Sequence, residues 1–162
     1  MKITDVKVHI LQSKLEQPFA FSQGWVRVRS ATIVEIHTDA GLIGWGEAFT
    51  QGLESPQIAA STIEYSLKPL VLGENPKNVE VLWHSMYNQT RDFGRKGSVM
   101  AAISGIDIAV WDILGKFYQV PVSQLIGGRF RASVQPYATG FYRVTGENEG
   151  DRLAEEAIAH ND

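Results

Sequence analysis

Residues 98–117 are the longest helix-like stretch of the chain, and they limit the fold more than any other part of the sequence. Apolar residues recur there at helical spacing on two adjoining stripes and predict one helix of about 30 Å. A helix that is apolar on most sides has to be covered by other elements, so it predicts the buried centre of a domain. Gly115 and Pro121 signal its end. The stripes consist of Ala102, Ile106, Ala109 and Ile113, and of Ile103, Val110 and Leu114.

The first half of the chain predicts strands followed by helices. Apolar and polar residues alternate in three segments, which indicates an antiparallel meander with a loop through residues 16–25 and a turn at 38–41. Ser55-Pro56 and Asn75-Pro76 are start signals for two helices, and we expect Pro69 to stop the first. Strands followed by a helical bundle define an α+β fold. The predicted strands are residues 2–11, 31–38 and 42–48.

The C-terminal part predicts one strand–loop–helix unit. Residues 133–139 are rich in strand-forming types, residues 140–146 suggest a loop, and residues 147–160 suggest a polar helix. A single unit of this kind cannot bury both faces of a parallel strand. We therefore expect the rest of a larger sheet or barrel to be missing from this sequence.

Composition excludes several classes of function. The net charge is -3 and the basic residues are scattered, so we expect no nucleic-acid partner. The chain has no cysteine, which excludes disulfides and thiolate metal sites. The N-terminus lacks a signal peptide and no unbroken run of about 18 apolar residues occurs, so we expect a cytoplasmic protein with no membrane contact.

Two segments resemble the mandelate racemase and muconate lactonizing enzyme family of the enolase superfamily. Residues 102–116, with Pro121-Val122 and residues 125–127, are similar to the first signature of that family, and Val110 is a mild apolar departure from it. Residues 44–48, Gly-Trp-Gly-Glu-Ala, are also typical of these enzymes. The resemblance implies an N-terminal capping domain over residues 1–130, followed at 131–162 by the first strand and helix of a truncated (β/α) barrel.

The resemblance also implies a chemistry. Enzymes of this family are Mg²⁺-dependent lyases and isomerases that abstract the proton next to a carboxylate, and Mg²⁺ stabilises the resulting enolate. Their lysine motif and metal ligands lie on later barrel strands, so we assign no catalytic residue and no metal ligand and expect this chain alone to be inactive. The chain resembles sugar-acid members such as dehydratases and a galactarolactone cycloisomerase, and family members are commonly homo-oligomers.

Two cap loops and one strand end are the predicted substrate-binding segments. By their order in the chain, the loops are residues 19–25 and 49–53, whose family counterparts close over the barrel mouth. Thr139 is expected at the C-terminal end of the first barrel strand, where barrel active sites form, with Tyr137 on the same side. The aromatic residues could equally pack in the cap core or barrel interior. The candidates are Phe21, Gln23, Trp25, Phe49, Thr50, Gln51, Tyr137 and Thr139.

Asp107 and Asp112 invite a different interpretation, as a pair of carboxylates. They are five residues apart, about 140° around a helix, so they cannot bind one metal from one face. Asp112 and Lys116 have the spacing of an ion pair. We expect a structural role for both aspartates. A second hypothesis for the whole chain is a non-catalytic cap-like fragment that serves only in folding or oligomerisation.

Overall fold

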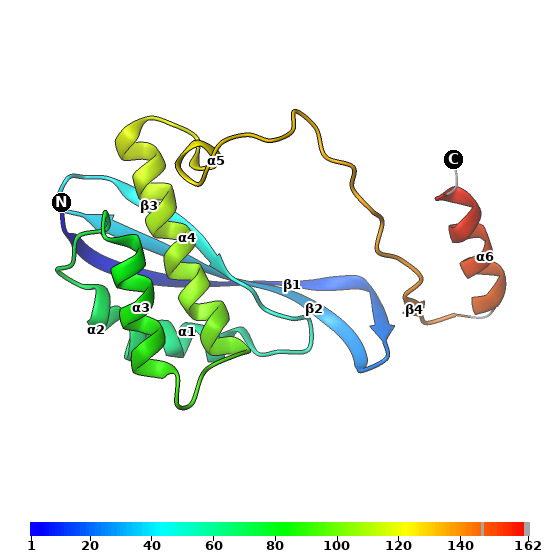
Figure 1. The fold of residues 1–162 in the computed structure, drawn as a ribbon. Coiled ribbons are helices and arrows are strands. Elements are labelled where there is room, and N and C mark those ends of the chain that lie inside the picture. Colours follow the sequence, from blue (N-terminus) through cyan, green and yellow to red (C-terminus); the bar gives the residue numbers. More distant parts are fainter. Residues whose placement is uncertain (147, 161–162) are drawn as a thin grey trace. The chain divides into compact units, whose positions relative to one another are not determined.

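The computed structural model describes residues 1–146 and 148–160, which divide into two units. The larger unit comprises Met1–Gln12 and Ser30–Arg129, and the smaller comprises Ser13–Arg29 and Phe130–Asp162. Strands β1 (Ile3–Phe21) and β2 (Gly24–Thr38) run through both units. The larger unit contains the helical layer, and the smaller contains the far end of the β1–β2 hairpin (Figure 1).

The sheet of the larger unit is the predicted meander. β3 (Ile43–Ala48), β2 and β1 lie side by side in that order, and β2 pairs antiparallel with β3. The turn between them is closed by Thr38, whose hydroxyl donates to the Leu42 carbonyl at 2.9 Å, while Gly41 adopts a φ of 76°. The predicted turn and antiparallel order are therefore confirmed.

β1 and β2 are longer than the alternation predicted. The loop prediction for residues 16–25 is wrong, because both strands continue through most of it and leave a two-residue turn at Ser22 and Gln23. Residues 11–17 are almost entirely exposed. Apolar and polar residues alternate only in a strand that buries one face. Residues 11–17 bury neither face, so their sequence shows no such alternation.

One carboxylate lies among basic side chains on the sheet. Glu35 accepts a hydrogen bond from His9 Nε2 at 2.7 Å and one from His37 Nε2 at 2.5 Å. The bond from His9, assisted by His37 and by the charge of Lys7, lowers the pKa of Glu35 despite its burial. Glu35 therefore stays ionised although it is nearly inaccessible to solvent.

The first helical segment changes type along its length. It runs through α1 (Pro56–Ser61), the π-helix η1 (Thr62–Leu67) and α2 (Lys68–Val71). The prediction that Pro69 stops this helix is wrong, since Pro69 lies in the first turn of α2. Proline lacks the N–H that an α-helix bonds four residues back, and the wider π turn before it accommodates that loss.

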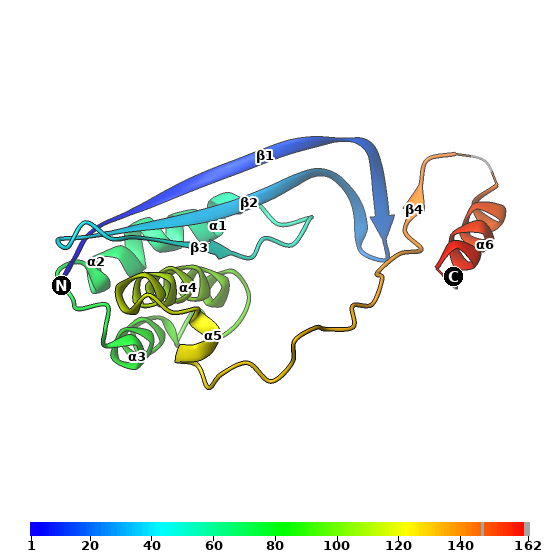
Figure 2. The same ribbon diagram turned by 90° about the horizontal axis from the view of Figure 1, so that it is seen from above.

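The remaining helices of the larger unit are α3 (Val79–Thr90), α4 (Ser98–Tyr118) and α5 (Val122–Leu125). α3 begins later than Asn75-Pro76 predicted, because Asn75 opens a turn in which its carbonyl accepts from Asn78 N at 3.0 Å. α4 agrees with the predicted long helix to within one residue. Figure 2 shows the helices on one side of the sheet, with α4 against β3.

α4 and β3 approach each other through glycine. A Cβ added at Gly46 would lie 2.1 Å from Gly105 O, and one added at Gly44 would lie 2.1 Å from Ala109 O. A normal carbon–oxygen contact is roughly 3.3 Å or longer. The Gly-x-Gly pattern of residues 44–46 therefore serves close packing of the strand on the helix.

The predicted ion pair at the end of α4 is confirmed and connects the helix to the strand. Lys116 Nζ lies 2.7 Å from Asp112 Oδ2 and also donates to Ile43 O at 2.7 Å. The same oxygen of Asp112 accepts from Trp45 N at 2.8 Å. Asp112 thus has a structural contact, as expected from the sequence.

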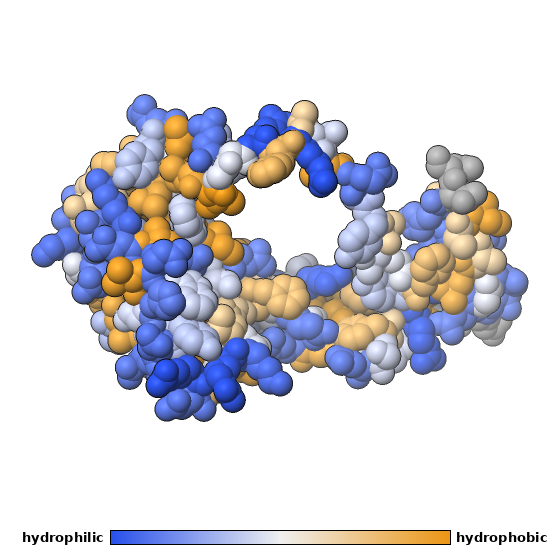
Figure 3. All heavy atoms as spheres, viewed as in Figure 1, coloured by the Kyte–Doolittle hydropathy of each residue, from blue (hydrophilic) through white to orange (hydrophobic). Residues whose placement is uncertain are grey.

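By length and composition, α4 is also the one helix among the described residues that could cross a membrane, with a mean hydropathy of 1.5. The buried core helix of a globular domain meets the same measure. α4 has nine buried residues in the core of the larger unit, which favours this second explanation. Figure 3 shows apolar residues left at the surface over α4 and α5. Ile108 and Ile126 are exposed large apolar residues of this part of the chain.

The smaller unit differs from its prediction in two segments, residues 133–139 and residues 143–144. β4 (Arg143–Val144) pairs antiparallel with β1 where a loop was expected, and α6 (Glu149–Ala159) confirms the polar helix, except for Glu147, which lies outside the described residues. The strand predicted at 133–139 is wrong, because that segment forms no ladder and is exposed. A barrel strand depends on ladders to its neighbours, and no described strand lies beside it. The α+β capping fold is confirmed, and the boundary at residue 130 stays a prediction.

Candidate functional site

The far end of the β1–β2 hairpin carries three of the predicted substrate-binding residues. We call this segment, residues 13–29, the arm. Phe21 and Trp25 lie near its turn and are half-buried, while Gln23 lies in the turn and is exposed. The tip of the arm therefore combines an accessible amide with two aromatic side chains.

Aromatic and guanidinium groups stack along the arm. The Phe19 ring lies 4.7 Å from the ring of Tyr142, and the Arg29 guanidinium lies 4.9 Å from the Phe19 centroid. Arg27 lies 5.9 Å from the Trp25 centroid. Contacts of these two kinds stabilise by about 0.5–1 kcal/mol each. Sequence reasoning missed the contact of Phe19 with Tyr142, because periodicity does not report pairs more than a hundred residues apart.

The segment that meets the arm is held by α6. Glu156 Oε1 accepts from Phe141 N at 2.9 Å, and Glu156 Oε2 accepts from Arg152 at 3.0 Å. Arg152 also donates to the Tyr142 carbonyl at 2.6 Å. These bonds fix the turn that presents Tyr142 to Phe19. The arm and residues 141–144 are far apart in the sequence, and the structure brings them together within one unit.

Thr139 and Tyr137 are not brought into this cluster by any contact of the described structure. Both are exposed, and 88% of Tyr137 is accessible to solvent. Side chains two residues apart point to the same side only in a strand. Because residues 133–139 form no strand, Tyr137 and Thr139 are not held on a common side. Their role in substrate binding stays a prediction.

The second predicted loop, residues 49–53, belongs to the larger unit and is a loop as expected. Phe49 is 68% exposed. Thr50 Oγ1 lies 3.4 Å from Thr32 Oγ1, and Gln51 Oε1 accepts from Leu53 N at 2.9 Å. The loop is therefore shaped by its own polar groups, and Phe49 is its most accessible large side chain.

The polar side chains of these segments are hydrogen-bond donors. Amide, hydroxyl and guanidinium groups donate hydrogen bonds of the kind that a hydroxylated acid accepts. Among residues 1–146 and 148–160, no group of three His, Cys, Asp or Glu side chains could hold a metal ion. The side chains of the described residues do not fit a Mg²⁺ site.

Comparison with known proteins agrees with the fold. Residues 3–127 match the sequence model of the mandelate racemase and muconate lactonizing enzyme N-terminal domain. The chain is similar to D-galactarolactone cycloisomerase of Agrobacterium fabrum, with 38% identity over 97% of this chain and 39% of the relative. It is also similar to arabinonate dehydratase of Saccharolobus solfataricus, with 45% identity over 67% of this chain and 28% of the relative.

Solved structures give the same result. The 3,6-anhydro-D-galactonate cycloisomerase of Zobellia galactanivorans superposes with a TM-score of 0.79 at 35% identity, over 99% of this chain and 40% of that chain. An enolase-superfamily member from Polaromonas sp. JS666 superposes with a TM-score of 0.84 at 31% identity, over 98% of this chain and 41% of that chain. The chain thus spans about two fifths of the length of these proteins. With a family match over most of its residues, the chain belongs to the mandelate racemase and muconate lactonizing enzyme family of the enolase superfamily.

Proposed function

We propose that this chain is the N-terminal, specificity-determining part of a Mg²⁺-dependent lyase or isomerase. The reaction begins with removal of the proton next to the carboxylate of a sugar acid and leads to dehydration, racemisation or cycloisomerisation. The relatives support this class, since they include a cycloisomerase and dehydratases whose names refer to sugar acids. The metal and the base belong to residues outside this sequence.

The contact between the arm and residues 141–144 carries the proposal. Residues 141–144 follow the segment that the family resemblance assigns to the first barrel strand, and they pair with β1 beside Phe19. A segment of the cap that contacts the loop after a barrel strand can shape a pocket at that loop and exclude water from it. We assign this role to the arm, through Phe21, Gln23 and Trp25, with Thr139 nearby in sequence.

We propose that the loop at 49–53 of the larger unit also contacts the substrate. Phe49 is accessible enough to cover an apolar part of a substrate, and Thr50 and Gln51 can bond hydroxyl groups. We further propose a cytoplasmic homo-oligomer with a small-molecule ligand and neither nucleic-acid nor membrane partners. Light scattering in solution measures the oligomeric state directly.

Proton exchange in D₂O tests the proposed chemistry. Galactarate, arabinonate, galactonate and, as a contrast without a polyhydroxylated chain, mandelate are incubated with Mg²⁺, and loss of the α-proton is followed by NMR. We expect no exchange with the 162-residue chain alone. The full-length protein should exchange a sugar acid and lose this activity in EDTA. Exchange by the chain alone, or a full-length protein that acts only on non-sugar carboxylates, would contradict the proposal.

Substitutions in the full-length protein test the assigned residues. Gln23→Ala and Thr139→Val each remove one proposed hydrogen bond to the substrate, and we expect roughly a tenfold loss of kcat/KM, which corresponds to about 1.4 kcal/mol. Gln12→Ala, on the same strand as the arm but outside it, is the matched control. Equal activity of all three variants and the parent would remove these residues from the site.

A further inference from the structure

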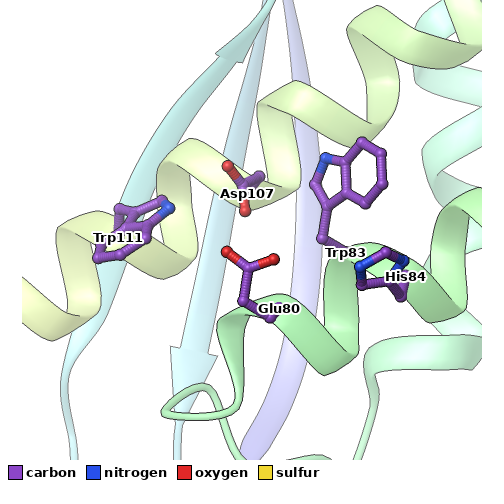
Figure 4. Close-up of a pocket in the computed structure, with 5 residues that line it drawn as sticks. All are labelled: Glu80, Trp83, His84, Asp107 and Trp111. Carbon is purple, nitrogen blue, oxygen red and sulfur yellow. The ribbon is translucent and has the colours of Figure 1, made fainter. Parts of the chain in front are cut away.

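A groove between α3 and α4 of the larger unit gathers two carboxylates and two indoles. Glu80, Trp83 and His84 from α3 and Asp107 and Trp111 from α4 line a cavity of about 300 Å³. Figure 4 shows the carboxylates of Glu80 and Asp107 directed toward one another, with the indoles of Trp83 and Trp111 on either side. The proposed sugar-acid site uses none of these residues.

Glu80 and Asp107 are the acidic side chains of the groove. Among the described residues, neither Glu80 nor Asp107 has an ion-pair partner within 4.0 Å. Burial of Asp107 and the charge of Glu80 raise the pKa of Asp107, against the hydrogen bond from Trp111. Lys77, which lies close in sequence, has its ammonium 3.8 Å from the Phe117 ring centroid. A bound cation would relieve this electrostatic cost.

The indole of Trp83 is packed against two neighbouring rings before any ligand binds. The Trp83 ring stacks on Tyr87 with centroids 5.1 Å apart and an angle of 13° between the rings. His84 meets Trp83 edge-on at 5.4 Å. Among aromatic rings, the indole face of tryptophan attracts cations most strongly. An indole fixed in this way loses little conformational freedom when a cation stacks on it.

The chemistry of the groove selects among cations. A guanidinium group is planar, stacks on aromatic rings and donates to two carboxylates at once, whereas an ammonium is a compact point charge. A metal ion is a poorer fit, because no three His, Cys, Asp or Glu side chains of the described residues could hold one. Trp111 also lines an apolar cavity of about 450 Å³ with Ile108 and Ile126. We expect this cavity to contact the aliphatic stem of an arginine.

We propose that the α3–α4 groove binds a guanidinium group that bridges Glu80 and Asp107 and stacks on the indoles of Trp83 and Trp111. This inference is independent of the sugar-acid activity. It differs from the structural role that the sequence suggested for Asp107.

NMR titration of the chain with Nα-acetyl-arginine amide tests the proposal. We expect the indole N–H signals of Trp83 and Trp111 to shift in a saturable way, with a dissociation constant on the order of 1 mM, while the signal of Trp25 in the arm stays fixed. The pKa of Asp107, followed by its carboxyl ¹³C signal, should fall when the ligand is bound. Nα-acetyl-citrulline amide, which is neutral and nearly isosteric, is the ligand control.

Two variants locate the site. Glu80→Gln and Asp107→Asn should each weaken binding at least fivefold, whereas Asp92→Asn removes an acid outside the groove and should leave binding unchanged. Glu80 is exposed, so its variant should fold even if that of Asp107 does not. Equal shifts with the citrulline ligand, or unchanged binding in the Glu80 variant, would overturn the proposal.

A short arginine peptide distinguishes the source of the guanidinium. Tighter binding of an acetylated Gly-Arg-Leu amide than of the arginine amide would assign the groove to an arginine side chain of a polypeptide. Equal binding of the two would assign it to a free guanidinium compound. Both results support the guanidinium site, and absence of saturable binding by either ligand refutes it.

Discussion

Replacing Gly46 with alanine tests how closely α4 packs on β3. The added Cβ would lie 2.1 Å from Gly105 O and 2.8 Å from Ala109 N, and both are backbone atoms of a helix that cannot rotate away. Relative to a carbon–oxygen contact of roughly 3.3 Å, the helix has to move by about 1.2 Å. Since α4 has nine buried residues, the displacement opens gaps throughout the core.

The magnitude follows from this displacement. A radial gap of about 0.5–1 Å forfeits a quarter to a half of each dispersion contact, and overpacking alone costs about 1–3 kcal/mol. We therefore expect Gly46→Ala to lower the free energy of unfolding by at least about 3 kcal/mol, or the melting temperature by roughly 6–12 °C. Urea unfolding followed by tryptophan fluorescence measures the change, with Gly150→Ala, where nothing lies within 4 Å of the new Cβ, as control.

A double variant separates this mechanism from a general intolerance of alanine. Gly44→Ala pushes on the same helix through Ala109 O, so one displacement of α4 relieves both clashes. We expect the double variant to lose clearly less stability than the two single losses added together. A loss below about 1 kcal/mol for Gly46→Ala, or strict additivity of the two, would refute the close-packing argument.

Three further predictions concern polar and aromatic contacts. Asp112→Asn weakens the bonds that tie α4 to β3 at 2.7 and 2.8 Å, and we expect chemical denaturation to show a loss of about 1–2 kcal/mol. Because folding lowers the pKa of Glu35 from 4.5, its stabilisation is complete at pH values well above 4.5 and is lost as the pH falls through the lowered pKa. Glu35→Gln should therefore reduce the loss of stability on acidification below about pH 4.5 in a series of melting curves. A double-mutant cycle of Phe19→Leu and Tyr142→Leu should give a coupling of about 0.5–1.5 kcal/mol, measured by hydrogen exchange of the arm, and a coupling of zero would show that the ring contact does not hold the arm.

The sequence predicted which candidate residues lie in loops and turns, but it did not predict which residues contact one another. Gln23 and Phe49 were named as loop residues, and the structure places Gln23 in a turn and Phe49 in a loop. The pairing of β4 with β1 was not predicted, since two residues are too few to show alternation. Glu80 was not named at all, because its meeting with Asp107 depends on how two helices pack.

The sequence by itself determined α4, the antiparallel order of the first three strands and the family. Each of these can be recognised from the local spacing of apolar residues or from a contiguous sequence motif. An element that packs with one face buried has apolar residues at the spacing of that face. The tertiary structure alone decided the length of the arm, the missing strand at 133–139, the π turn before Pro69 and the groove that joins Glu80 to Asp107. These features depend on which distant backbone or side chain is present as a partner, and no local pattern of residues contains that information.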